Sequence, residues 1–256
     1  MIYLYGLCNI PVAQVSAQIQ NCDGLQGPLR LAAIAGWTLV YSDHDDQEII
    51  PRRRLLLRHT QILEGLLQLG AVLPARFGLV AATLEQVHDL IVARATVIGT
   101  EFDKIAGAVE IGVRIRFARE AALTAALDAD PTLKAAHRDL MQKGPDAHFA
   151  IAAFGGKLAE RVDRRRGLAQ KQLLDAFRPL ARDHVLRAPE DDTEVLRAEF
   201  LLDAARQEAF QTTVQDAAQT LDFAPESEPQ IQIIGPVPMY NFVRLNLSFD
   251  QEEAVA

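Results

Sequence analysis

Residues 108–118, AVEIGVRIRFA, carry the clearest structural pattern in the chain. Apolar residues such as Ile111 and Val113 alternate there with polar residues such as Arg114 and Arg116. A period of two residues is typical of a strand with one buried and one exposed face, so we predict a half-buried strand over this stretch.

Strands and helices alternate in the sequence that precedes this strand. In chain order we predict a buried strand at 2–7, two short strands or a hairpin at 29–42, a helix from Pro51 to Leu69, a strand at 71–77 and a helix that follows its N-cap Thr83. Two helices against one antiparallel or mixed sheet are typical of a ferredoxin-like α/β sandwich. We assign this N-terminal domain to residues 1–118.

The remaining residues, 119–256, predict a more helical α+β domain. The pattern indicates two short helices divided at Asp130–Pro131, a long charged helix at 156–187, a strand at 195–203, a helix at 205–221 and a strand at 230–235. The fold class predicted for the whole chain is therefore α+β with two domains.

Composition excludes several classes of protein. The chain has 256 residues, of which 49% are hydrophobic and 23% charged, and its formal net charge is −8. An acidic chain does not bind nucleic acid through its overall field, and no apolar stretch reaches the ~20 residues of a membrane-spanning helix. The N-terminus has no basic segment of a signal peptide, so we expect a cytoplasmic location. Only Cys8 and Cys22 are present, too few for a disulfide scaffold or a thiolate zinc site.

No constellation of catalytic, cofactor-binding or metal-binding residues is apparent. The acidic loop at 43–46 contains His44 but lacks the spacing of a calcium site, and a solvated loop is the better interpretation. His59 lies on the first long helix without a nucleophile motif nearby, so we interpret it as a packed, hydrogen-bonded histidine. The GGK sequence at 155–157 lacks the rest of a phosphate loop.

Arginines occupy three unusual positions. One run, Arg52–Arg54, begins a predicted helix, where cations oppose the helix macrodipole, and a second run lies at 164–166. Each run is either a solvated face or a contact for an acidic surface, and we favour the former. Arg76 lies in the apolar segment LPARFG, where we expect a buried guanidinium bound to carbonyls or a carboxylate.

Several segments together resemble the gas vesicle protein F / gas vesicle protein L family. The similar segments are YLYG at 3–6, AVLPARFG at 71–78, EIGVRIRF at 110–117, EFLLD at 199–203 and IIGPVPMYNFV at 233–243. They occur in the family's order and extend over nearly the whole chain. Leu79, Arg197 and Glu199 depart from the family pattern, which leaves open whether the chain is F-like or L-like.

The resemblance implies a gas vesicle accessory protein and no enzyme. It implies partners, namely the hydrophobic, GvpA-like shell subunit and other accessory proteins, and a location at the gas vesicle. We expect partner-binding residues or structural corners at Pro74, Arg76, Phe77, Pro236, Pro238, Tyr240 and Phe242. Two other functions stay open: a small-molecule-binding regulatory or enzymatic domain, because ferredoxin-like sandwiches host many functions, and a structural component of the shell.

Overall fold

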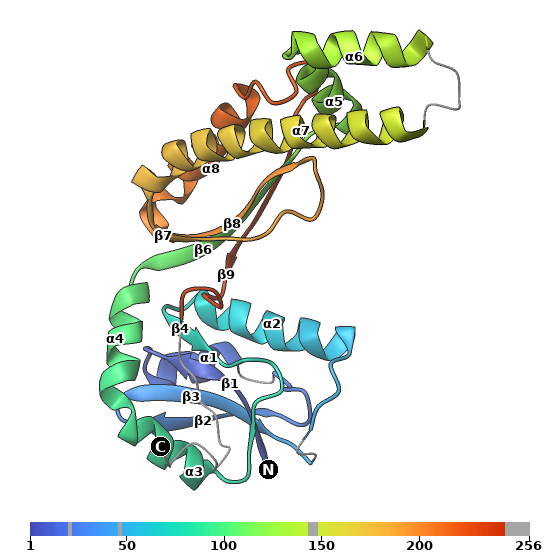
Figure 1. Ribbon diagram of the computed structural model, residues 1–256. Coiled ribbons are helices and arrows are strands. Elements are labelled where there is room, and N and C mark those ends of the chain that lie inside the picture. The colour runs from blue at the N-terminus through green and yellow to red at the C-terminus, as the bar shows by residue number, and fades with distance from the viewer. Residues whose placement is uncertain (20–21, 46–47, 143–147, 244–256) are drawn as a thin grey trace. The chain divides into compact units, whose positions relative to one another are not determined.

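The computed structural model describes residues 1–19, 22–45, 48–142 and 148–243, and the chain divides into two compact units (Figure 1). The first unit contains Met1–Glu110 and the described residues from Pro236 onward, and the second contains the chain from Ile111 to Gly235. The sequence predicted one boundary near residue 118. In the structure the chain instead leaves the first unit within one strand, β6, and returns to it within another, β9.

The first unit has the ferredoxin-like topology that the sequence predicted. Its elements are β1 (Ile2–Cys8), α1 (Val12–Ile19), β2 (Leu29–Ile34), β3 (Trp37–Asp43), α2 (Arg53–Leu67), β4 (Val72–Pro74), β5 (Val80–Ala81), α3 (Leu84–Ala93) and α4 (Ala95–Ile105). The strand order is β2-β3-β1-β4, and each neighbouring pair is antiparallel. With α1 and α2 as the connections, this is the βαββαβ arrangement of ferredoxin-like folds.

Helix α1 is an element that the sequence analysis did not predict. It has only eight residues, and Val15 is its fully buried side chain. A helix this short gives too few turns for a 3.6-residue apolar period to stand out. The hairpin at 29–42 is confirmed: Ala35 and Gly36 both have positive φ, which suits the tight turn between paired antiparallel strands.

The central strand β1 is buried along its whole length. Tyr3 and Tyr5 contribute to a core that also contains Val15 of α1 and Leu63 of α2. Figure 1 shows α2 on one side of this sheet and α3 on the other, so β1 has a helix layer on both faces. Thr83 caps α3 as predicted, because its side chain accepts a hydrogen bond from the Gln86 amide at 3.2 Å.

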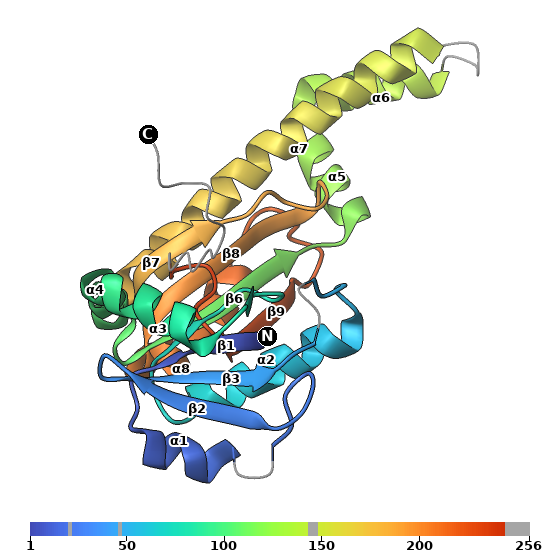
Figure 2. The ribbon, with the colours of Figure 1, turned by 90° about the horizontal axis from the view of Figure 1, so that it is seen from below.

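The second unit is built on a sheet of order β7-β8-β6-β9. Its elements are β6 (Ala108–Arg116), α5 (Arg119–Asp128), α6 (Pro131–Gln142), α7 (His148–Phe177), the 3-10 turn η1 (Arg178–Leu180), β7 (Ala181–Leu186), β8 (Glu194–Asp203), the 3-10 turn η2 (Ala204–Arg206), α8 (Gln207–Gln219) and β9 (Gln230–Val237). Figure 2 shows α6 alongside the N-terminal part of α7. Phe177, Phe200 and Phe210 form an aromatic core cluster with ring centroids 5.1 to 5.8 Å apart.

Two sequence predictions in this unit are wrong in detail. The strand at 108–118 exists as β6, but it pairs in the second sheet and not in the ferredoxin-like one. The long helix predicted at 156–187 begins earlier, at His148, and ends at Phe177, after which the chain enters β7. Pro179, in the turn η1 that follows, explains the end, because a proline has no backbone N–H to continue the helical hydrogen bonds.

Candidate functional site

The LPARFG segment forms a loop between β4 and β5. Buried Pro74 ends β4, and the Ala75 amide donates to the carbonyl of Tyr5 at 2.8 Å. Gly78 has φ of 88°, a conformation that favours glycine, and its amide donates to the Tyr3 hydroxyl at 3.3 Å. The loop between these anchors exposes Arg76.

The exposure of Arg76 corrects the sequence prediction of a buried guanidinium. Arg76 follows buried Ala75 but lies at the outer side of the turn, which the Leu79 amide closes on the Arg76 carbonyl. The backbone turns outward here, so an apolar sequence context did not bury the charge. The neighbouring ring of Phe77 points inward and packs against the rings of Tyr3 and His59. The ring centroids are 6.2 Å apart for Tyr3 and 5.7 Å apart for His59.

His59 is the buried, hydrogen-bonded histidine that the sequence predicted. Its Nδ1 accepts a hydrogen bond from the Tyr3 hydroxyl at 2.7 Å, and its Nε2 donates to the Ala75 carbonyl at 3.1 Å. Burial lowers the pKa of His59 to about 4 and raises that of Tyr3. Both ring nitrogens are occupied and only 2% of the residue is exposed, so His59 ties β1 to the LPARFG loop and does not serve as a general base.

The segment after β9 is fixed to the rest of the first unit by hydrogen bonds to Glu110 and Lys104. The carboxylate of Glu110 accepts two hydrogen bonds from Asn241, from the backbone amide at 3.1 Å and from Nδ2 at 2.6 Å. Lys104 donates from Nζ to the Phe242 carbonyl at 2.7 Å. Glu110 is only 1% exposed, so its charge is compensated by these donors, consistent with the rule for buried carboxylates.

The predicted corner residues of this segment separate into two groups. Pro238 and Phe242 are buried and Pro236 is half-buried, whereas Tyr240 is 41% exposed. The Tyr240 hydroxyl is hydrogen-bonded to Thr60 of α2, and partial burial raises its pKa to about 12. Met239, which the sequence analysis did not single out as a candidate, is fully buried.

The LPARFG loop and the segment after β9, which are far apart in the sequence, therefore meet on α2. We call the set Tyr3, His59, Thr60, Phe77 and Tyr240 the motif junction. Phe77 packs against His59, to which Tyr3 is hydrogen-bonded, and Tyr240 binds Thr60 one residue further along. No local sequence signal could show that a loop at 71–78 and a segment at 236–243 share one helix.

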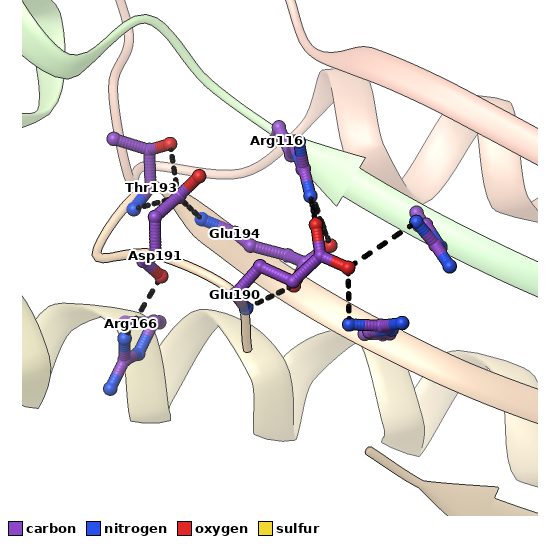
Figure 3. A network of polar contacts seen from close by, with 8 residues as sticks. Arg116, Arg166, Glu190, Asp191, Thr193 and Glu194 are labelled. Carbon is purple, nitrogen blue, oxygen red and sulfur yellow. Dashed lines mark hydrogen bonds and ion pairs between the residues drawn. The ribbon is translucent and has the colours of Figure 1, made fainter. Parts of the chain in front are cut away.

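A separate polar network lies in the second unit (Figure 3). The Glu190 carboxylate contacts Arg116 and Arg197 at 2.5 Å each and Arg114 at 3.7 Å. Arg116 also bonds Glu194, whose carboxylate is fully buried and accepts the Glu190 amide at 2.6 Å. These arginines lower the pKa of Glu190, and each of them has a carboxylate partner, so the network fastens the loop before β8 to the sheet.

The second basic run, at 164–166, has partners within its own unit. Arg166 pairs with Asp163 at 2.8 Å and donates to the Asp191 carbonyl, and Arg165 donates to the carbonyls of Asp222 and Phe223. Two of the three arginines thus have intramolecular roles.

The structure also shows the surroundings of the other candidate residues, Cys8 and His44. Cys8 is buried, and burial raises its pKa to about 12, which suppresses the thiolate. His44 is buried, contrary to the prediction of a fully solvated loop, and its ring lies 5.9 Å from that of Tyr3. Within the described residues, no three His, Cys, Asp or Glu side chains are grouped as metal ligands, and no helix combines the length and apolarity needed to cross a membrane.

Fold and site define a class of protein: a two-unit α+β protein whose motifs converge on a structural junction. The chain belongs to the family of gas vesicle synthesis protein GvpL/GvpF, whose sequence model matches residues 1–244. It is 28% identical over 221 residues to gas vesicle protein F of Microcystis aeruginosa strain PCC 7806, covering 84% of this chain and 87% of that protein. It is 26% identical over 225 residues to gas vesicle protein F of Nostoc sp. strain PCC 7120, covering 86% of this chain and 90% of that one.

Solved structures agree in fold. The crystal structure of GvpF from Microcystis aeruginosa has a TM-score of 0.72 at 26% identity and covers 95% of this chain and 99% of that one. The crystal structure of GvpF from Anabaena sp. PCC7120 has a TM-score of 0.81 over 96% and 98% of the two chains, and at 24% identity it supports the fold alone. The expected family membership is thereby confirmed, and the protein has a role in gas vesicles.

Proposed function

We propose that this protein binds the hydrophobic shell subunit of the gas vesicle and other accessory proteins, keeps the subunit from aggregating and assists nucleation and assembly. The observation that carries the proposal is membership of the GvpL/GvpF family over residues 1–244. The protein acts in the cytoplasm and at the vesicle as an accessory factor without catalysis.

The physical chemistry of a gas-filled shell supports this role. A shell that keeps liquid water out needs an apolar inner face, and before assembly that face and its unpaired strand edges are prone to aggregate. A soluble partner suppresses aggregation by covering the apolar surface. The net charge of −8 keeps such a carrier and its complex apart from other copies through self-repulsion.

Differences in burial support different roles for the candidate residues within this proposal. Tyr240 and Arg76 are exposed and are of the residue types enriched at binding hot spots, so we assign partner contact to them. Pro74, Pro238 and Phe242 are buried and hold the surface in place.

Co-expression with the shell subunit, followed by sedimentation and pull-down, tests the function. We expect the subunit to stay in the supernatant with the wild-type protein and to pellet without it. A subunit that pellets equally in both cases would refute the proposal. Recovery of the protein in finished vesicles at a fixed, near-equal ratio to the subunit would instead indicate a structural shell component.

Two variants distinguish a loss of contact with the shell subunit from a loss of folding stability. Tyr240→Ala should reduce capture and lower the melting temperature much less than Phe242→Ala does, because the residue is 41% exposed and has one hydrogen bond to Thr60 to lose. Phe242→Ala removes a ring that is 2% exposed and should cost about 3–5 kcal/mol of folding stability. If Tyr240→Ala captures the subunit as well as the wild type does, the assignment of contact to Tyr240 is wrong.

A further inference from the structure

The arginines that begin α2 lack the intramolecular partners found for the second basic run. Arg52 is the N-cap of α2 and makes no side-chain cap hydrogen bond, and Arg53 and Arg54 follow as the first helical residues. All three are exposed, and no ion pair joins them to a carboxylate within the described parts of the chain. Three cations at the positive end of a helix dipole disfavour the helix, so their position is not explained by folding stability.

Apolar side chains lie on the same exposed side of α2. Leu56 and Leu57 are 40% and 51% exposed, and Ile50, just before the helix, is 69% exposed. The buried side of the helix is formed by His59, Ile62, Leu63 and Leu66. Because residues three and four apart share a face, Arg53 is beside both leucines on the outer surface.

A preformed pocket borders this surface. It has a volume of about 400 Å³ and is lined by Gly24, Leu25, Arg54, Leu55, Leu57, Arg58 and Gln61. Its far wall is the loop at 23–25, which is fixed because Arg58 donates to the Asp23 carbonyl and the Leu25 amide donates to the Tyr5 hydroxyl at 2.6 Å. A Cβ on Gly24 would lie 2.5 Å from the Tyr5 hydroxyl oxygen, so the wall requires glycine to approach this closely.

We propose that Arg53, Arg54, Leu56, Leu57 and the adjoining pocket, here named the arginine–leucine face, dock an acidic amphipathic helix of a partner protein. An apolar side chain of that helix enters the pocket between Leu25 and Leu57, and its flanking carboxylates pair with Arg53 and Arg54. This surface is separate from the assignment of shell-subunit contact to Tyr240.

Charge and shape together select this occupant. Arginines without carboxylate partners call for a ligand that brings carboxylates, and the exposed leucines beside them call for apolar side chains on the same ligand. The surface is the side-chain face of a helix and offers no free strand edge, which favours helix docking over strand addition. Along α2 from Arg53 to Gln61 it extends for about 12 Å at 1.5 Å per residue, a length suited to about two turns of a partner helix.

The direct test uses a dye-labelled, 18-residue helical peptide with leucines on one face and glutamates on both flanks, followed by fluorescence anisotropy. The wild-type protein should bind it saturably, and binding should weaken as salt is raised. The double variant Arg53→Glu/Leu57→Asp should bind at least about tenfold more weakly. A peptide with lysines in place of the glutamates should recover binding to the variant Arg53→Glu/Arg54→Glu.

The chain contains a matched control. Arg164 and Leu168 of α7 are also an arginine and a leucine four residues apart, and both are exposed, with Leu168 at 66%. The variant Arg164→Glu/Leu168→Asp makes the same chemical change and should bind the peptide as the wild type does. Circular dichroism melting of each variant shows whether it is folded.

Three results would overturn the proposal. The first is that the wild type shows no saturable binding of the peptide. The second is that the α2 and α7 variants lose binding equally. The third is that the pocket binds laurate but not the peptide, which would assign the pocket to a small amphiphile. Shell-subunit capture is measured separately with the same variants. Loss of capture with peptide binding intact, or the reverse, shows which of the two proposals has failed.

Discussion

Acidification should destabilise this protein through His59, and a single substitution should remove the effect. Burial lowers the pKa of His59 from 6.5 to about 4, so the folded state favours the neutral imidazole. The stability that this preference contributes is present above pH 6.5 and is lost as the pH falls from 6.5 toward 4. At about 1.36 kcal/mol per pKa unit, the full loss is about 3 kcal/mol.

Most of this loss falls in a pH range where the carboxylates titrate little and the exposed histidines titrate alike in the folded and unfolded states. Linkage gives a loss of about 2 kcal/mol by pH 5, where ordinary Asp and Glu side chains, with pKa values of about 3.9 and 4.3, are still mostly ionised. Protonating His59 also adds a donor at Nδ1, which must then face the Tyr3 hydroxyl now acting only as an acceptor. The free energy of unfolding should therefore fall between pH 6.5 and 5 with a slope that corresponds to nearly one proton taken up per molecule on unfolding.

Urea unfolding at pH 7.0, 6.0, 5.5 and 5.0 measures this slope. The variant His59→Gln keeps an amide donor for the Ala75 carbonyl but cannot titrate, so its stability should change by about 2 kcal/mol less over the same range. The matched control is His88→Gln, at an exposed position of α3. Equal slopes in the wild type and His59→Gln would refute the account of His59 as a buried neutral histidine.

Four further variants test the packing and the electrostatics. Gly6→Ala should destabilise the fold by about 1–3 kcal/mol in urea unfolding, because the new Cβ would lie 2.6 Å from a backbone oxygen, whereas Gly156→Ala, in open space on α7, should stabilise it by about 0.5–1 kcal/mol. Glu110→Gln should cost about 1–3 kcal/mol and speed proteolysis near Asn241, because the amide cannot accept both hydrogen bonds. Arg53→Glu should raise stability by about 0.3–1 kcal/mol, since a carboxylate suits the start of a helix, and a lower melting temperature would contradict this.

Short-range patterns in the sequence determined several elements of this protein. The hairpin around Gly36, the N-cap at Thr83 and the helix break at Asp130–Pro131 depend on backbone preferences of a few adjacent residues, and the structure confirms all three. The motifs that resembled the gas vesicle family were likewise local stretches, and the family was confirmed.

Only the tertiary structure decided how distant segments combine. The alternation in 108–118 identified a strand but not its sheet, because period two reports burial of a face and not the identity of the neighbours. Arg76 was expected to be buried because of its apolar neighbours, yet the direction of one turn exposes it. The meeting of Phe77 and Tyr240 on α2, and the carboxylate of Glu110 that holds Asn241 across 131 positions, depend on chain paths that no local residue preference encodes.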